Sequence, residues 1–267
     1  MLRLLPYLLV TLAASPALAG ATAWQELASG ASVRLISSDR MDGGETLAGL
    51  ELRLPEGANT YWRIPGDSGI PTSLDLSASM AISGSEVLWP FPSIETTGGY
   101  RDFVYRGAVV LPIRLKPSPG AVLKVMVSLG VCSDICIPAR AQLMLSLDPA
   151  RPDAAEAIRL DQALADVAIG WDVPGEPFAA VTLARDGKGL VIANPDPSID
   201  PGSVIADAGD AGLSLAAPQK SPDGALWTLE AEGGATLSAL AGRPVQFTFM
   251  TSRGPYEVTR TVAAAAQ

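Results

Sequence analysis

The fold is indicated first by the stretch Leu123-Lys124-Val125-Met126-Val127-Ser128-Leu129. Every second residue in it is a branched aliphatic one, and the residues between them include a lysine and a serine. Successive side chains of a β-strand point to opposite faces of the sheet, so this alternation is typical of a strand with one buried face. The stretch therefore predicts an antiparallel sheet that covers a hydrophobic core.

The same period of two recurs on both sides of this stretch. In the first half of the chain we expect further strands at Ala31–Ser37, Thr46–Leu54, Glu86–Trp89, 109–115 and 143–147. In the second half we expect strands at Phe178–Ala184, Gly189–Ala193, Ala225–Ala231, Val245–Met250 and Tyr256–Val262. Short strands separated by turn residues predict an all-β protein built from β-sandwiches.

The alternation stops at the proline-marked segment Asp148-Pro149-Ala150-Arg151-Pro152-Asp153. The following residues, Asp153–Asp166, are rich in alanine, leucine, glutamate and glutamine, which predicts a short helix in a linker. We therefore expect four parts: a signal peptide at 1–19, a first β-sandwich domain at 24–148, a linker with a short helix at 149–167, and a second β-sandwich domain at 168–263.

The amino terminus has the pattern of an export signal. Arg3 precedes the apolar run Leu4–Leu12, and Ala17-Leu18-Ala19 provides a small-x-small cleavage site. The run is too short for a comfortable membrane span, and no later stretch is long and apolar enough. We expect an exported protein that does not itself span the membrane. Its formal net charge of −9 argues against a nucleic-acid-binding surface.

The chain of 267 residues has two cysteines and no histidine. Both cysteines lie in Val131-Cys132-Ser133-Asp134-Ile135-Cys136-Ile137-Pro138. In an oxidising compartment such a pair persists as a disulfide, which is either structural or exchanging. A structural bridge across this short loop would contribute only roughly 2 kcal/mol by chain entropy, and it would fix a local turn. The spacing alone leaves both uses open.

The residues around the cysteines favour slow, partner-dependent chemistry. Asp134 and the isoleucines at 135 and 137 disfavour a thiolate, so we expect a relay that is selective for its partner. Two cysteinates could alternatively hold Cu(I), with Met126 or Met144 adding a thioether. Structural zinc would need four Cys or His ligands, and the chain also lacks a nucleotide-binding glycine loop, so we expect no cofactor.

Two other motifs have the residue types of a functional site. Gly66-Asp67-Ser68-Gly69 resembles the tetrapeptide around a protease nucleophile, but a serine of that kind needs a histidine base, so we interpret it as a turn. Large aromatic residues occur beside turns in Tyr61-Trp62-Arg63 and Trp89-Pro90-Phe91-Pro92. They either close the ends of the sandwich or form a docking or shielding surface near the cysteines.

Four ordered segments resemble the amino-terminal periplasmic domain of the DsbD thiol:disulfide interchange family, in the ScsB-like (suppressor of copper sensitivity) variant. They are Tyr61-Trp62-Arg63-Ile64-Pro65-Gly66-Asp67-Ser68-Gly69-Ile70-Pro71, Val87-Leu88-Trp89-Pro90, Tyr105-Arg106-Gly107-Ala108-Val109-Val110-Leu111-Pro112 and Cys132-Ser133-Asp134-Ile135-Cys136-Ile137-Pro138. The second half is more weakly similar to the second periplasmic domain of ScsB-type proteins.

The resemblance implies an immunoglobulin-like fold and thiol–disulfide exchange of the protein-disulfide reductase type in the periplasm. Cys132 and Cys136 would form the redox pair, with Cys136 entering mixed disulfides. Reducing equivalents would come from a membrane-embedded donor of the DsbD/ScsB type and pass to periplasmic thioredoxin-fold proteins. The family shields its cysteines with a cap loop, which by position falls near Thr96–Arg101; Gly98-Gly99 occupies that region here, leaving Tyr100 or Phe103 as cap residues.

The resemblance implies that full-length members of the family continue into a membrane domain and a thioredoxin-like domain, and we expect neither in this sequence. The relay hypothesis therefore needs a separate membrane protein as donor. Two other hypotheses remain open: a non-catalytic exported binding module whose disulfide orders a loop, and a Cu(I)-binding accessory protein of copper tolerance.

Overall fold

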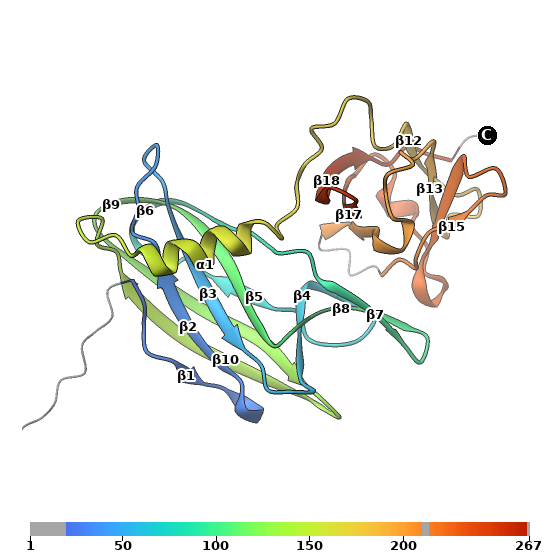
Figure 1. Ribbon diagram of the computed structural model, residues 1–267. Helices are drawn as coiled ribbons and strands as arrows, with labels where there is room; N and C mark the ends of the chain where they lie inside the picture. Colours follow the sequence, from blue (N-terminus) through green and yellow to red (C-terminus); the bar gives the residue numbers. More distant parts are fainter. Residues whose placement is uncertain (1–19, 210–213, 266–267) are drawn as a thin grey trace, which may run out of the picture.

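The computed structural model describes residues 20–209 and 214–265. The signal peptide expected at 1–19 lies outside this range. The described residues form one large sheet assembly, one α-helix and two smaller sheets, in that order along the chain (Figure 1). This confirms the predicted all-β fold: an immunoglobulin-like β-sandwich, a short helical linker and a second β-sandwich.

The first β-sandwich contains ten strands. They are β1 (Gln25–Glu26), β2 (Ser32–Ser37), β3 (Thr46–Arg53), β4 (Asn59–Gly66), β5 (Ser73–Asp75), β6 (Met80–Val87), β7 (Ser93–Thr97), β8 (Tyr100–Arg106), β9 (Ala108–Cys132) and β10 (Cys136–Ser146). Their main hydrogen-bonded order is β1-β2-β3-β9-β4-β8-β7, and β5, β6 and β10 also pair with β9. The pairs within this assembly are antiparallel.

Strand β9 is the central strand of the first sandwich, because different strands pair with its two halves. Its first half lies between β3 and β6, and its second half lies between β5 and β10. The strands expected at 109–115 and 123–129 are therefore two parts of one strand, which continues through the segment 116–122. The alternating aliphatic residues of both parts are buried in a single core: Leu111, Ile113, Leu115, Leu123, Val125, Val127 and Leu129.

The helix α1 (Ala154–Leu164) lies across the first β-sandwich (Figure 1). Asp153 caps its amino terminus, since its carboxylate accepts hydrogen bonds from the backbone amides of Ala155 and Glu156. Leu160 is fully buried, and Gly49 of β3 provides the space for it: a Cβ added at Gly49 would lie 2.8 Å from Leu160 Cδ2. Close packing of a leucine against a glycine thus fixes the helix on the sheet.

The second β-sandwich consists of two four-stranded sheets. One contains β11 (Ile169–Gly170), β18 (Gly254–Thr261), β17 (Pro244–Thr251) and β14 (Ile205–Asp207). The other contains β12 (Ala180–Leu183), β13 (Gly189–Ala193), β16 (Leu226–Glu230) and β15 (Gln219–Lys220). Their core is centred on the rings of Phe178, Phe247 and Phe249, which lie 5.4 Å apart in two tilted or edge-on pairs.

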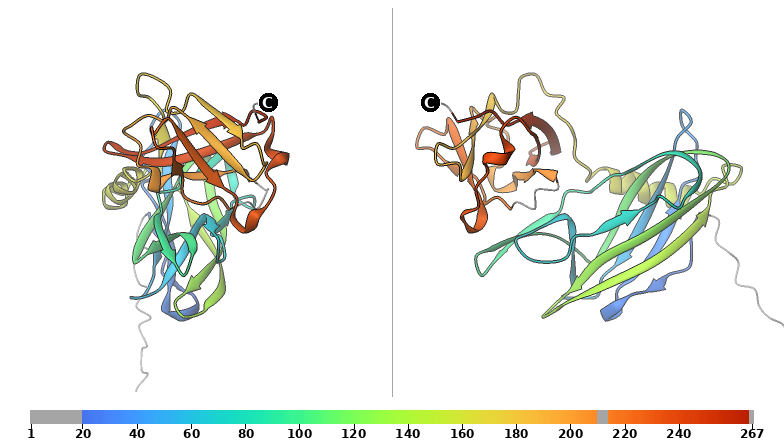
Figure 2. Two further views of the ribbon diagram at one scale, coloured as in Figure 1. Left: turned by 90° about the vertical axis from the view of Figure 1, so that its right-hand side faces the viewer. Right: turned by 180° about the vertical axis from the view of Figure 1, so that it is seen from behind.

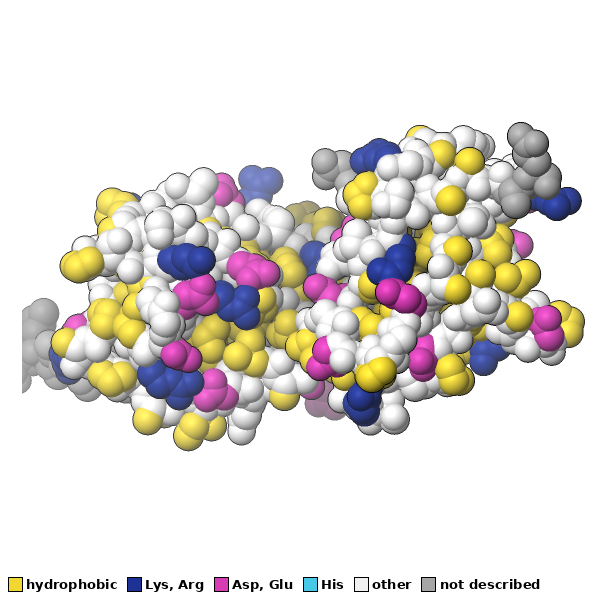
Figure 3. Space-filling view, turned by 90° about the horizontal axis from the view of Figure 1, so that it is seen from above, with side chains coloured by type: hydrophobic (Ala, Val, Ile, Leu, Met, Phe, Trp, Pro, Cys, Tyr) yellow, Lys and Arg dark blue, Asp and Glu magenta, His cyan; other side chains and the backbone are white. Residues whose placement is uncertain are grey.

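The two sandwiches meet at residues 202–207 and Ser214 of the second one, close to the β7–β8 hairpin of the first (Figures 1 and 2). Ile205 of β14 is buried and belongs to the hydrophobic core cluster of the first sandwich. Acidic and basic side chains are interspersed over both sandwiches when the molecule is viewed from above (Figure 3). Among the described residues, no helix is long and apolar enough to cross a membrane.

Candidate redox site

The two cysteines form a disulfide at the tip of the β9–β10 hairpin. Cys132 ends β9 and Cys136 begins β10, and the two residues face each other in the antiparallel register with Cα atoms 4.0 Å apart. The connecting residues are closed by a hydrogen bond from the Ser133 amide to the Ile135 carbonyl. The ladder continues from this pair to Ser146 and Val122, so the disulfide closes the end of a long, regular hairpin.

The two sulfur-bearing residues differ in exposure. Cys132 is 3% exposed and packs with Tyr61 and Val104, whereas Cys136 is exposed. Asn59 of β4 pairs with Cys132, which places this cysteine inside the sheet. An attacking thiol from another protein can therefore reach Cys136, while Cys132 is suited to act as the leaving or resolving group.

The aromatic side chain next to the exposed cysteine belongs to Tyr61. Its hydroxyl lies 4.0 Å from Cys136 Sγ, and the side chain is 5% exposed. The sequence leaves open whether the Tyr61–Arg63 stretch forms a surface near the cysteines or closes the end of the sandwich. The structure divides the stretch: Tyr61 lies beside the disulfide, and Trp62 is buried in the core.

Phe103 and Tyr100, the residues predicted as a cap, occupy two other positions. Phe103 is 4% exposed and packs edge-on against Trp62 in the core cluster, whereas its neighbour Val104 packs on Cys132. Adjacent strand residues point to opposite faces, so Phe103 points away from the disulfide. Tyr100 is 58% exposed at the start of β8 and lies roughly 13 Å along the strand from Val104. A capping role for either residue stays a prediction, and the burial pattern favours Tyr61.

The methionines considered as copper ligands lie far from the cysteines. Met126 precedes Cys132 by six residues on β9, which is roughly 20 Å along an extended strand. Met144 pairs with Lys124, still farther from the disulfide, and both methionines are exposed on the outer face of the hairpin. Neither thioether can therefore complete a copper site with the two cysteines.

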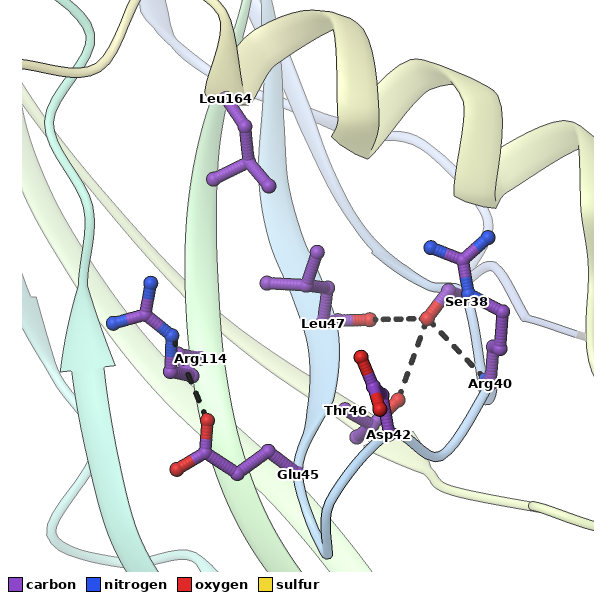
Figure 4. Close-up of a pocket in the computed structure, with 8 residues that line it drawn as sticks. All are labelled: Ser38, Arg40, Asp42, Glu45, Thr46, Leu47, Arg114 and Leu164. Atoms are coloured by element: carbon purple, nitrogen blue, oxygen red, sulfur yellow. Dashed lines mark hydrogen bonds and ion pairs between the residues drawn. The ribbon is translucent and has the colours of Figure 1, made fainter.

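A separate pocket of about 180 Å³ lies between α1 and β3, and it is lined by Ser38, Arg40, Asp42, Glu45, Thr46, Leu47, Arg114 and Leu164 (Figure 4). Two ion pairs involve its lining residues: Arg114 with Glu45 at 3.7 Å, and Arg40 with Asp161 at 3.3 Å. Arg114 lies eighteen positions before Cys132 on β9, so the pocket is at the opposite end of the first sandwich. The pocket and the disulfide are separate sites.

Comparison with known proteins defines the class of the first sandwich. Residues 32–148 match the family model described as "Thiol:disulfide interchange protein DsbD, N-terminal". This part of the chain is thus a DsbD N-terminal-like domain, which confirms the resemblance found in the sequence.

The whole chain is similar in structure to the N-terminal periplasmic domain of ScsB from Proteus mirabilis. The two share 23% sequence identity and superpose with a TM-score of 0.70 over 92% of this chain and 100% of that one. At this identity the similarity is one of fold, and it includes both sandwiches. No curated protein matches the chain significantly.

Proposed function

We propose that this protein exchanges thiols and disulfides with partner proteins through Cys132 and Cys136. The observation that carries the proposal is the asymmetric pair at a hairpin tip, with an exposed Cys136 and a buried Cys132, in a DsbD N-terminal-like domain. A bridge that only held the sandwich together would better join distant strands, because the entropic gain rises with the length of the closed loop.

The exchange proceeds in two successive thiolate attacks. A thiolate of the electron donor attacks Cys136 Sγ, a bond forms between the donor sulfur and Cys136, and the Cys132–Cys136 bond breaks to release a Cys132 thiolate that takes up a proton. A second donor thiolate attacks the mixed disulfide and releases Cys136, so the donor becomes a disulfide and the pair becomes a dithiol. With an oxidised acceptor the same steps run in reverse: Cys136 attacks and Cys132 resolves.

The partners follow from the family resemblance. Reducing equivalents enter from a membrane-embedded donor of the DsbD/ScsB type and leave to periplasmic thioredoxin-fold proteins. The protein acts in the periplasm after export through its predicted signal peptide. The second sandwich provides additional surface for one of these partners.

Trapping of mixed disulfides tests the proposal. In Cys132→Ala the remaining thiol is the exposed Cys136, so oxidised thioredoxin-fold partners should be captured as a covalent complex that a reductant dissolves. In Cys136→Ala the remaining thiol is buried, and we expect no complex. Non-reducing electrophoresis and mass spectrometry of the linked peptides measure both, with the double variant as the control.

Two outcomes would count against the proposal. Capture by Cys136→Ala alone would reverse the roles of the two cysteines. Capture by neither variant would favour the binding-module hypothesis, in which the disulfide only orders the hairpin tip.

A further inference from the structure

The segment Gly66-Asp67-Ser68-Gly69, here called the 66–69 turn, is held firmly on β8. Ser68 donates through its backbone amide to Asp102 Oδ1 at 2.9 Å and through its hydroxyl to Asp102 Oδ2 at 2.6 Å. The Arg101 amide donates to Asp67 Oδ2 at 2.6 Å. Gly66 has a φ of +89°, and a Cβ there would lie 2.2 Å from the Arg101 carbonyl oxygen, so only glycine permits this approach.

One side of the 66–69 turn contacts the second sandwich. The Ser214 hydroxyl donates to Asp67 Oδ1. The buried Arg101 guanidinium donates to the carbonyl oxygens of Gly202 at 2.9 Å and Val204 at 3.0 Å. These bonds join the turn and β8 to Gly202, Val204 and Ser214 of the second sandwich.

The contact between the sandwiches is also electrostatic. Arg63 of β4 forms an ion pair with Asp207 at 3.2 Å and donates to Gln246 Oε1 at 3.1 Å. Burial lowers the pKa of Arg101, while the charges of Asp67 and Glu232 act in the opposite direction. Arg63 thus pairs with a carboxylate of the second sandwich, and Arg101 with two of its backbone carbonyls.

The other side of the 66–69 turn contacts the ring beside the disulfide. Gly69 has a φ of +112°, and a Cβ there would lie 2.1 Å from Tyr61 Cζ, so the backbone of the turn lies directly on the Tyr61 ring. The hydroxyl of the same ring is 4.0 Å from Cys136 Sγ. A continuous path of contacts therefore leads from the second sandwich, through the turn and Tyr61, to the exposed sulfur.

We propose that the second sandwich regulates access to Cys136 through the 66–69 turn, an inference that rests on the proposed exchange at this cysteine. While the sandwiches are in contact, the turn holds the Tyr61 ring against one side of the exposed Cys136 sulfur, so that a thiolate can approach it from fewer directions. When the contact opens, the turn loses its support on one side, and the ring can move away. A partner protein that binds residues 202–207 and Ser214 in place of the first sandwich accelerates the exchange.

Kinetics of disulfide opening test this coupling in the full chain. The variant Asp207→Asn/Ser214→Ala removes the ion pair with Arg63 and the hydrogen bond to Asp67 without altering the first sandwich. Loss of about 1.4 kcal/mol of contact energy increases the separated population about tenfold, so we expect dithiothreitol to reduce the disulfide about tenfold faster. Timed alkylation of the released thiols, read by mass spectrometry, gives the rate.

The matched control is Asp223→Asn/Ser221→Ala. It removes a similar aspartate–serine hydrogen bond, of 2.6 Å, in an exposed turn of the second sandwich. This control should reduce at the wild-type rate. Equal rates for wild type and Asp207→Asn/Ser214→Ala, or equal acceleration in the control, would overturn the coupling.

The role of the ring is tested by combining substitutions. Tyr61→Leu should accelerate reduction by itself, and adding Asp207→Asn/Ser214→Ala should then cause no further increase. If the added pair still accelerates reduction, the path does not pass through Tyr61.

Should Tyr61→Leu fail to fold, the salt dependence of the reduction rate tests the coupling with Tyr61 unchanged. Raising NaCl from about 0.1 M to about 1 M shortens the Debye length from about 10 Å to about 3 Å, so wild type should approach the rate of the Asp207→Asn/Ser214→Ala variant. An unchanged ratio of the two rates would contradict the coupling.

The outcomes separate this inference from the proposed function. If the reduction rates change as expected but Cys132→Ala captures no partner, the coupling holds and the exchange reaction does not. If Cys132→Ala captures partners and the rates are equal, exchange holds and the coupling does not.

Discussion

Individual residues of this protein owe their roles to the strand face on which they lie. Phe103 and Val104 are neighbours, yet one packs in the core and the other on Cys132. The same alternation separates Trp62 from Tyr61 on β4. A single step along the chain therefore decides whether an aromatic residue packs in the core or lies beside the disulfide.

A buried carboxylate gives a prediction about how the free energy of unfolding depends on pH. Asp39 is buried at a backbone φ of 49°, and burial raises the pKa of its carboxyl, while the Ser37 hydroxyl donates to it and opposes the rise. A raised native pKa contributes stability below the unfolded-state pKa, and this contribution is lost as pH rises through the native pKa. In Asp39→Asn the unfolding free energy relative to wild type should therefore increase from about pH 4 to about pH 7.

Urea unfolding at several pH values measures this difference, and Asp75→Asn is its opposite control. Hydrogen bonds from Ser77 lower the pKa of Asp75, so removing this carboxylate should make the variant less stable relative to wild type as pH rises. Parallel pH profiles for Asp39→Asn and wild type would show that Asp39 does not titrate as described.

Two glycines with left-handed backbones give a second prediction. Gly69→Ala places a Cβ against the Tyr61 ring, whereas Gly98→Ala places one in open space. Both substitutions strain the backbone by about 1–2 kcal/mol, and the overlap with the ring should cost Gly69→Ala about 1–3 kcal/mol more. Chemical denaturation of both variants measures the difference, and equal losses would argue against tight packing of the 66–69 turn on Tyr61.

Whole elements of the first sandwich were readable from the sequence because local patterns specify them. The alternation at 109–115 and 123–129 identified the buried face of β9, and the Pro152-Asp153 start identified helix α1. The disulfide between Cys132 and Cys136 also followed from residues close in sequence. The contacts of Arg63, Asp67 and Arg101 could not be predicted, since their partners lie more than 100 residues away and the three resemble ordinary surface residues in the sequence.

The packing of helix α1 on the first sandwich gives a prediction about stability. Leu160 is fully buried against Gly49, whereas Ile158 is 59% exposed on the same helix. Leu160→Ala should destabilise the first sandwich by about 2–5 kcal/mol, and Ile158→Ala by less than about 1 kcal/mol. Thermal unfolding followed by circular dichroism compares them, and similar losses would mean that the helix is not packed through Leu160.

The two sandwiches of the molecule differ in what they contribute. The first sandwich carries the disulfide, and the second contacts the first through Arg63, Arg101 of β8, the 66–69 turn and the buried Ile205. The fold similarity to the ScsB N-terminal periplasmic domain extends over both sandwiches. The arrangement of two sandwiches is thus shared with that domain.

A further prediction concerns the reduction potential of the disulfide in the native protein. An exposed disulfide that serves exchange should have a potential above about −300 mV, in the range where thioredoxin-type partners can reduce it. Equilibration with glutathione or dithiothreitol buffers, followed by thiol counting, measures it in the full chain. A value well below about −300 mV would identify a structural bridge.

The long ladder between β9 and β10 also determines what happens after the sulfur–sulfur bond opens. Eleven residue pairs, from Ser146 and Val122 to Cys136 and Cys132, remain to keep the hairpin closed. The two thiols thus stay opposite each other at a high effective concentration, so ring closure competes strongly with any intermolecular step. A covalent intermediate with another protein should therefore be short-lived in the wild type and accumulate only when the resolving thiol is removed.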